Sequence, residues 1–599
     1  MLPIRSHARR RLLSLPALPA LPACFRRSYI PPVALKREIL KASDPISEQL
    51  SDSLVWTPPK LRPKGSKPIA RADKTRINIT SESLCDDITT YLGDSLLRHQ
   101  GCDLIDMYPG AGVWSRKLHD VLQPRSHILM EPDCALYTPF LQSLLDKPGT
   151  RLVPKAGIVW TDLNSVLSPE FLPHQTPRPW APATPPERND TLLVTMNLAS
   201  FPARRFLNFE SVASLVLFQL LSSMRAGSIF QRYGLVRLLV WTTPEDKSRL
   251  LPRVIQCRNR AAMDAELNTE WVREVAGVNN TLAPVAGHNF SRDMNIDIEG
   301  MAKVVARMRA QGLATPPGRE SDMLADVREI GDGGVLAADN QAPVWPFSDE
   351  AEFLELSDEF QAGRIERGTN KFKRYQNLLH YHSWKQNRSG AFFTTEAERR
   401  AIIDLYRAAS PDAPEREAAW IETLANQDRK RREQYQLYRD NLHVFNQDPP
   451  VLMWDRRPYE PLRVEPDEFF PNVPMALMDI QPRATHPLLR DMGRHSTHAG
   501  DFFELIMRSL MSFGTQGPSS ALRYIAPGCS DAVIPNCPSL RDPDAGGSPM
   551  SGYGEISCRT LNERQMMEIL QAWMDWPLKP SYSHLVGRLT DTEEPEDEE

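Results

Sequence analysis

The chain has 599 residues, of which 41% are hydrophobic and 25% are charged, and its formal net charge is −5. This composition is typical of a soluble globular protein with more than one domain, and it excludes a fibrous chain and a surface that is basic throughout. Eight cysteines without a CxxC pair indicate reduced thiols, so we expect no metal site. The longest apolar run, Phe206–Met224, is broken by polar residues, so we also expect no membrane span.

The N-terminal segment has the composition of a transit peptide. Six arginines precede residue 28, and the first acidic residue is Glu38. A secretory signal is the competing interpretation, but Pro16, Pro19 and Pro22 interrupt its apolar stretch. A third interpretation of this segment is a basic disordered tail. We therefore predict a mitochondrial transit peptide over residues 1–38 and a location in the mitochondrial matrix.

Residues 39–75 read as an extended, basic, proline-rich arm. Between Pro58 and Arg76 there are seven lysines or arginines against one aspartate. Such an arm can lie along phosphates, and a merely solvated linker is an equally good interpretation.

Residues 76–283 alternate between helical and strand patterns, which predicts an α/β domain. Strands separated by helices favour a doubly wound parallel sheet that binds ligands at the carboxyl ends of its strands. The expected helices are 83–99, 113–122, 136–145 and 206–224, and the expected strands are 103–108, 127–131, 190–197 and 234–242.

The remaining chain divides by composition. Residues 284–349 read as a connector, 446–499 as the remaining strands of the sheet, 500–586 as a small C-terminal helical domain and 587–599 as an acidic tail. Residues 350–445 read as a charged helical insertion that mixes Lys and Arg with aromatic residues. That mixture is found where single strands are held by stacking and charge; aromatic packing in a local core is the simpler alternative.

The stretch "DLIDMYPGAGVWSRKL", residues 103–118, carries the strongest chemical signal. A strand that ends in an acidic residue, then a glycine turn and a helix start, suits an adenosyl cofactor, because glycine lets the backbone approach the ligand. Asp106, Gly110 and Gly112 occupy these positions, and Glu131, at the end of the next strand, can accept both ribose hydroxyls. The GxGxxG pattern is absent, which favours S-adenosylmethionine over NAD.

Several blocks in order resemble the fungal mitochondrial transcription factor B group of the ribosomal-RNA adenine N6-dimethyltransferase family. They are "DLIDMYPGAGVWSRKL", "PRSHILMEPD", "DTLLVTMNLAS", "QRYGLVRLLVW", "PNVPMALMDIQP" and "LQAWMDWPLKP". The resemblance covers roughly residues 75–315 and 450–585 and leaves out the insertion. It implies a class I S-adenosylmethionine-dependent methyltransferase domain with a Rossmann-like sheet.

The resemblance also implies a cofactor site, consisting of Tyr108, Gly110, Gly112, Glu131, Asn197 and Ile79. In the family's first motif, E-I-G-P-G-x-G, Tyr108 replaces a glycine that admits the cofactor. The family's Q-x-F-L segment aligns with Arg76–Ile79 and has lost its glutamine, and Asp162 is the nearest candidate for the third-motif aspartate. S-adenosylmethionine is therefore expected as a retained or vestigial ligand.

The fourth motif departs furthest from the active family. Enzymes that carry N-L-P-Y or N-L-P-F hold the target adenine by the asparagine and stack the aromatic ring on the flipped base. Here Asn197 stays, but Ala199 and Ser200 replace the proline and the ring; the alternative is that Phe201 fills the gap after a backbone shift. Leu510–Ser520 also lacks the basic run of active relatives. The catalytic role of Asn197 therefore holds only if the protein is active.

Two functions follow from the resemblance. The first is a transcription initiation factor that helps a single-subunit mitochondrial RNA polymerase melt promoter DNA and binds the melted single strand. The second is an active dimethylase of adenines in small-subunit mitochondrial ribosomal RNA. An RNA-binding ribosome-assembly protein is a third, weaker interpretation. The expected partners are polymerase, promoter DNA and, for the second and third functions, ribosomal RNA, with the protein a monomer away from any membrane.

Overall fold

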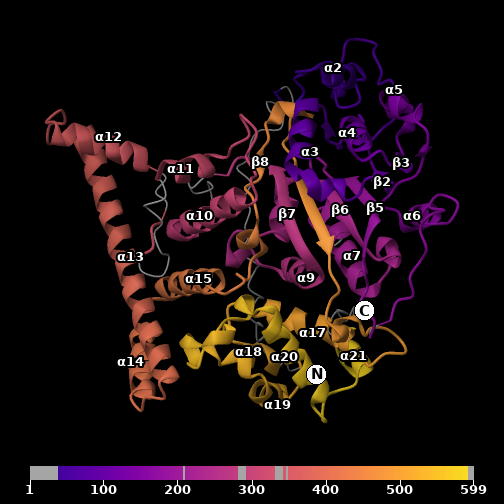
Figure 1. Cartoon of the computed structure of the whole chain (residues 1–599). Coiled ribbons are helices and arrows are strands. Elements are labelled where there is room, and N and C mark those ends of the chain that lie inside the picture. The colour runs from indigo at the N-terminus through magenta and orange to yellow at the C-terminus, as the bar shows by residue number, and fades with distance from the viewer. Residues whose placement is uncertain are drawn as a thin grey trace, which may run out of the picture.

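The computed structural model describes residues 38–181, 183–206, 209–280, 292–330, 341–345 and 349–590. The predicted transit peptide lies outside these residues except for Glu38, as do the last nine residues of the predicted acidic tail. A central sheet carries helices on both faces, a helical domain lies at one end of the sheet, and a helical insertion projects to one side (Figure 1).

The central sheet has eight strands in the order β4-β3-β2-β5-β6-β10-β7-β8. Strands β4 to β6 run parallel, β10 is antiparallel to both of its neighbours, and β8 is parallel to β7. The predicted α/β class is thereby confirmed. The strands are β2 Asp103–Met107, β3 Ser126–Met130, β4 Thr150–Val153, β5 Arg188–Asn197, β6 Leu235–Thr242, β7 Thr269–Gly277, β8 Leu462–Arg463 and β10 Ala476–Pro482; β1 Asn78–Ile79 and β9 Phe469–Phe470 form a separate pair.

Side chains alternate along each strand, so the two faces of the sheet pack in two different hydrophobic cores. On β2, Leu104 packs with helices α3 and α4, whereas Ile105 and Met107 pack with α6 and α7 on the other face. The helices of this region are α3 Glu82–Leu97, α4 Val113–Leu122, α5 Cys134–Leu145, α6 Trp160–Val166, α7 Val212–Ala226, α8 Pro244–Leu250 and α9 Arg260–Asn268.

Helix α7 corrects one predicted boundary. We expected a helix from Phe206, but it begins at Val212 because Ser211 caps it, accepting from the Ser214 backbone N–H. The segment Val212–Tyr233 is long and apolar enough to cross a membrane, and 44% of its most apolar window is buried inside the protein. Val216 and Leu220 pack on the sheet, so α7 is a core helix here.

The segment predicted as a connector contains two helices that belong to the core. These are α10 Met294–Ala310 and α11 Asp322–Ile330, beside the β7 and β8 edge of the sheet (Figure 1). Met301 and Val304 of α10 and Leu324 of α11 are buried with Val275 of β7.

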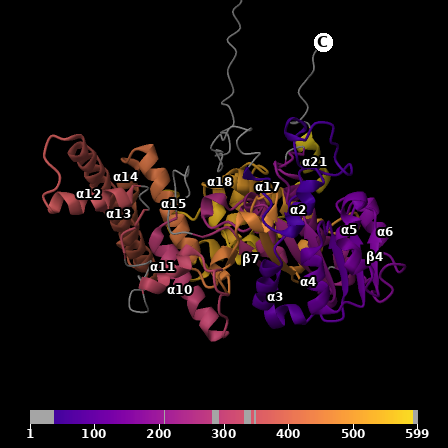
Figure 2. The ribbon, with the colours of Figure 1, turned by 90° about the horizontal axis from the view of Figure 1, so that it is seen from above.

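The segment predicted as a helical insertion contains four helices, and the view from above shows it on the opposite side of the molecule from α4 to α6 (Figure 2). The C-terminal segment is also helical, and its helices have their own core against Met263 and Leu267 of α9. The insertion helices are α12 Glu350–Gln361, α13 Asn370–Arg407, α14 Ala413–Ala425 and α15 Arg429–Phe445; the C-terminal helices are α16 Pro487–Arg490, α17 Ala499–Ser512, α18 Pro518–Arg523, α19 Cys529–Val533, α20 Glu563–Asp575 and α21 Tyr582–Thr590.

Candidate functional site

The glycine turn after β2 has a left-handed backbone at three residues. Gly110 and Gly112 have φ of 58° and 72°, and Tyr108 has φ of 62°. A Cβ on Gly112, which starts α4, would lie 2.7 Å from Leu141 Cδ2. Glycine is therefore required at that position by conformation and by space, whereas Tyr108 occupies a conformation that costs an L-residue about 1–2 kcal/mol.

Glu131, at the carboxyl end of β3, is fully buried and has its carboxylate surrounded by donors. Oε1 accepts from the Asp133 backbone N–H at 2.9 Å, and Oε2 accepts from the Gly110 backbone N–H at 3.2 Å. The Arg76 guanidinium donates to both oxygens, at 2.6 and 2.9 Å. The carboxylate that would bind ribose hydroxyls has its acceptor sites occupied by the protein's own groups.

Arg76 is held in a cage of aromatic rings and carboxylates. Its guanidinium carbon lies 5.1 Å from the ring centroid of Tyr108 and 4.7 Å from that of Tyr137, distances that suit cation–π attraction. Asp133 Oδ2 is 3.7 Å from Nη1. Burial alone would lower the pKa of Arg76, but the charges of Glu131 and Asp133 outweigh it and hold the pKa above its usual value. We call Arg76, Tyr108, Glu131, Asp133 and Tyr137 the Arg76 cage.

The arm that delivers Arg76 is folded onto the sheet, so the prediction of an extended arm is wrong. Helix α2 Pro45–Asp52 is capped by Asp44, and Leu50 and Trp56 are buried with Tyr137 and Phe470. Trp56 Nε1 donates to the Arg76 carbonyl oxygen at 2.9 Å. The arm's apolar residues thus fix the backbone from which Arg76 reaches Glu131, and the basic pattern of the arm concealed them.

The same segment of chain lies along the fourth motif. Asn197 Nδ2 donates to the Ile77 carbonyl oxygen at 2.9 Å, and Asn197 Oδ1 accepts from the Ala199 backbone N–H at 3.1 Å. Ser200 forms an antiparallel bridge with Arg76. Both polar ends of the Asn197 amide are therefore engaged by the protein's own backbone.

The side chain after the bridge also has a structural position. Phe201 donates its backbone N–H to the Thr75 carbonyl oxygen at 2.6 Å, and its ring packs against the core that includes Trp241. The ring therefore does not replace the missing aromatic residue at position 200.

The other residues named from the sequence are spread around this centre. Ile79 pairs with Phe469 through β1 and β9 and lies in the core. Asp106 is buried with Oδ2 3.8 Å from His127 Nε2 on β3. Asp162 lies in the first turn of α6, and β4 is followed by Pro154 and Lys155 instead of an acid. The sequence thus placed the loop and Glu131 together but missed Arg76, Trp56 and Tyr137.

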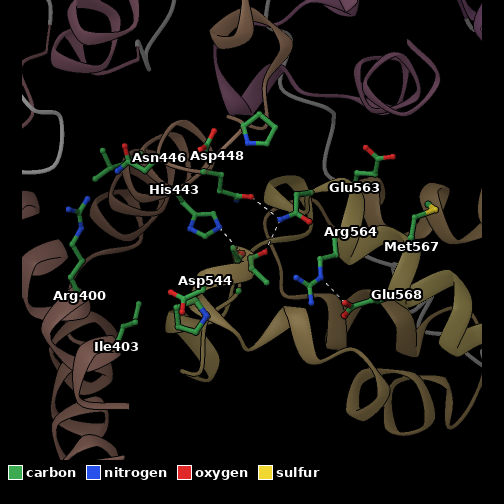
Figure 3. A pocket seen from close by; sticks show the side chains of 18 of the residues that line it. Arg400, Ile403, His443, Asn446, Asp448, Asp544, Glu563, Arg564, Met567 and Glu568 are labelled. Carbon is green, nitrogen blue, oxygen red and sulfur yellow. Dashed lines mark hydrogen bonds and ion pairs between the residues drawn. The ribbon is translucent and has the colours of Figure 1, made fainter. Parts of the chain in front are cut away.

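A cavity of about 1220 Å³ lies between the insertion and the C-terminal domain (Figure 3). Six arginines and six carboxylates line it, and several are paired, as in Arg564 with Glu568 at 3.1 Å. His443 Nε2 donates to the Gly546 carbonyl oxygen at 3.1 Å, and burial lowers the pKa of His443 to about 4. The mixed charges favour neither an anion nor a cation. Among the described residues no group of three or more His, Cys, Asp or Glu side chains could hold a metal.

These observations define an α/β protein with a glycine turn and a buried acid at the ends of adjacent strands, where Arg76 pairs with the acid. No family model matches the chain. A segment of 156 residues is 25% identical to Mitochondrial transcription factor 1 from Saccharomyces paradoxus. The match covers 26% of this chain and 40% of the relative. The resemblance to the fungal mitochondrial transcription factors is therefore supported by a direct sequence match.

Proposed function

We propose that this protein is a mitochondrial transcription initiation factor built on a class I methyltransferase fold with a closed catalytic pocket. The name of the matched relative supports a role in mitochondrial transcription. The strand order supports the fold class: with the seven core strands numbered along the chain, the sheet reads 3-2-1-4-5-7-6 with the seventh strand antiparallel, as in class I methyltransferases.

The Arg76 cage is the observation that carries the proposal. A methyltransferase needs the carboxylate of Glu131 for the cofactor ribose and the amide of Asn197 for the base, and here one segment, Thr75–Ile77, occupies both. A bidentate Arg–carboxylate pair that is fully buried is geometrically specific and costly to open. The competing function, methylation of ribosomal RNA, requires both groups to be released.

The residues present do not fit S-adenosylmethionine as a resident cofactor. Tyr108 stands where the family has glycine, and its ring lies against the Arg76 guanidinium. A Cβ placed on Gly110 would meet Asn78 Oδ1 at 2.5 Å, so the space above the turn is already occupied by the protein. We therefore propose that the cofactor site is vestigial and that the sheet serves as a scaffold.

The surface around the closed pocket supports a nucleic-acid partner. Lys60, Lys64, Lys67, Arg71 and Lys74 of the arm are exposed. The loop that follows Phe201 adds the exposed Arg204, which pairs with Asp73 of the arm, and the exposed Arg205. Of the seven cations between Pro58 and Arg76, only Arg76 is buried. We propose that this face lies against promoter phosphates, where each neutralised phosphate contributes to a salt-dependent affinity.

A factor of this kind acts by binding the open promoter better than the closed one. Melting costs about 1.4 kcal/mol per base-pair step on average, and a protein can shift that equilibrium only by its differential affinity for the two states. The polymerase, the promoter DNA and the matrix location are part of the same proposal, and we expect the protein to act as a monomer.

Run-off transcription from a linear mitochondrial promoter tests the function. The cognate polymerase is assayed with and without the full chain, and with a variant in which Lys64, Lys67 and Arg71 are changed to Glu. We expect promoter-specific transcripts only with the wild-type chain and a weaker, less salt-sensitive effect with the variant. Transcripts that do not depend on the protein, together with methyl transfer to ribosomal RNA, would overturn the proposal in favour of the enzyme.

Cofactor binding is tested separately by equilibrium dialysis with radiolabelled S-adenosylmethionine. We expect no binding by the wild-type chain. Arg76→Gln, which restores the family's residue and removes the charge that holds Glu131, shows whether Arg76 alone closes the site. Micromolar binding by the wild-type chain would mean that the pocket is in use and that the cage opens in solution.

A further inference from the structure

The first seven turns of α13 have an unusual charge pattern. Between Asn370 and Thr395 the helix carries five lysines or arginines and no aspartate or glutamate, although the chain as a whole is acidic. Helix α13 is also the longest described element and lies at the outer side of the insertion (Figures 1 and 2). At its start, Lys371 and Arg374 pair with carboxylates on or next to α12, so only part of this positive charge is presented to a polyanion.

The aromatic residues of α13 divide into packed and exposed groups. Near its start, Tyr375 stacks between Phe353 and Phe360 of α12, and further along, Phe392 packs against Tyr435 of α15. Between these two anchors Tyr381 and Trp384 remain 44% and 43% exposed. Packing in a local core, one of the two interpretations of the sequence, therefore applies to the outer aromatic residues. The central pair stays on the surface, where the other interpretation, stacking with a single strand, remains to be considered.

Tyr381 and Trp384 form a stacked pair backed by cations. Their ring centroids are 6.0 Å apart and the planes differ by 16°. Lys385 Nζ lies 5.2 Å from the Tyr381 ring centroid, and the Arg388 guanidinium carbon lies 4.9 Å from that of Trp384. The four residues follow the spacing i, i+3, i+4 and i+7, so they share one face of the helix. We call them the α13 face.

The cations of the α13 face, Lys385 and Arg388, are half-buried, and charges of both signs lie around them. Arg388 Nη2 is buried without a hydrogen-bond partner. Asp349 and Glu350 lie near Lys385, and Asp428 and Arg431 lie near Arg388. At the start of α15, Arg429 and Arg431 pair with Glu433 and Asp428, but their side chains are 87% and 60% exposed. Exposed pairs of this kind contribute little, so a polyanion can compete for them.

We propose that the α13 face binds single-stranded DNA, with unpaired bases stacking on Tyr381 and Trp384 and phosphates contacting Lys385 and Arg388. Unpaired bases are required because a duplex buries both faces of each base, whereas a melted strand exposes them to aromatic side chains. The choice of DNA rests on the proposed function, since promoter opening supplies a melted DNA strand. The insertion would then add a second contact to that strand, separate from the basic arm.

Fluorescence anisotropy with a labelled oligo(dT) tests the proposal on the full chain. We expect Tyr381→Ala/Trp384→Ala to weaken binding at least about tenfold. Trp384→Phe, which keeps a stacking ring, should retain most of the affinity. Tyr553→Ala is the matched control, because Tyr553 is a 46% exposed aromatic residue outside the face. An equal loss in the control, or no loss in the double variant, would overturn the proposal.

The cations are tested by the salt dependence. Lys385→Gln/Arg388→Gln should lower the slope of log affinity against log salt by about 1.4, since each phosphate contact on a single strand contributes about 0.7. Affinity for a duplex of the same length should be unchanged in all α13 variants. A duplex loss equal to the single-strand loss would mean general charge attraction and would overturn the stacking role.

Run-off transcription separates this proposal from the function on which it rests. Suppose that oligo(dT) binding depends on the α13 face but the protein does not support promoter transcription. This result would overturn the proposed transcription function and leave the proposed DNA-binding role of the α13 face standing. If transcription is normal and the double variant keeps its oligo(dT) affinity, the proposed transcription function stands and the proposed DNA-binding role of the α13 face is wrong. If the double variant instead loses polymerase binding and keeps oligo(dT) affinity, the face docks a protein and the DNA proposal is wrong.

Discussion

Arg76 and Arg388 both lie beside aromatic rings, yet their surroundings give them opposite roles. Arg76 is 7% exposed and its guanidinium is matched by a carboxylate that is fully buried. Arg388 lies on a helix segment without acidic residues, next to an exposed tryptophan. Burial with a paired carboxylate gives Arg76 a structural role, whereas Arg388, which is half-buried and has no hydrogen-bond partner at Nη2, is the candidate for a ligand contact. Residue type alone does not distinguish them.

The largest effect is expected from breaking the buried pair. Arg76→Met leaves the Glu131 carboxylate buried with no cation, which should cost about 3–5 kcal/mol of unfolding free energy in a urea titration. Arg71→Met removes an exposed arginine of the same arm and should cost little. Arg76→Met/Glu131→Leu should recover most of the loss, because it removes both charges. A loss below that of Arg71→Met would show that the cage is not formed in solution.

The next prediction compares two tryptophans of the insertion. Trp420 on α14 is 4% exposed and packs against Tyr435, whereas Trp384 is 43% exposed. We expect Trp420→Ala to cost about 3–5 kcal/mol through the cavity it leaves, and Trp384→Ala to stay within about 0.5 kcal/mol. Chemical denaturation followed by circular dichroism measures both. Equal losses would mean that Trp384 is a packing residue and would weaken the case for the α13 face.

Gly110 tests whether the turn above Glu131 is filled. Gly110→Ala places a Cβ 2.5 Å from Asn78 Oδ1 at a left-handed residue, whereas Gly101→Ala places one in open space at a φ of 72°. Both variants carry the conformational cost of about 1 kcal/mol or more, so the difference between them reports the steric part. We expect Gly110→Ala to be less stable by a further 1–3 kcal/mol, approximately. Equal thermal shifts would indicate free space at the turn.

The smallest effect concerns a buried carboxylate that is only half satisfied. Asp293 Oδ1 accepts from the backbone N–H groups of Asn295 and Val344, but Oδ2 is buried without a partner. Burial raises the pKa of Asp293 to about 7. The folded state therefore holds a proton that the unfolded state has lost above about pH 4, so the stability from this group falls as the pH rises from about 4 to 7.

Asp293→Asn should remove that pH dependence, because the amide keeps an oxygen acceptor and carries no charge. We expect the variant to gain about 1 kcal/mol relative to the wild type between pH 6 and pH 7 in urea titrations. Glu131 is the carboxylate with which Asp293 is compared, because both of its oxygens accept hydrogen bonds from the protein. Parallel pH profiles for the wild type and Asp293→Asn would contradict the buried, half-satisfied state of this carboxylate.

The sequence located the elements around the site but not the contacts across it. The predicted helix at 113–122 and strands near 103–108 and 127–131 agree with α4, β2 and β3, because period and turn residues are local signals. The prediction for residues 39–75 failed because proline and lysine dominate the local pattern, while Leu50 and Trp56 are buried only by distant partners. Helices α10 and α11 were missed for the same reason, since their apolar faces are covered by β7 and β8.

By itself, the sequence determined the α/β class, the place of the glycine turn and Glu131, the loss of the stacking residue at Ser200 and the resemblance to fungal mitochondrial transcription factors. Only the tertiary structure decided that Arg76 neutralises Glu131 across 55 positions of the chain and that Tyr381 and Trp384 stay on the surface while neighbouring rings are buried. Local pattern records which residues a chain carries. Whether a charge is paired or a ring is covered depends on residues distant in the sequence, which folding alone brings together.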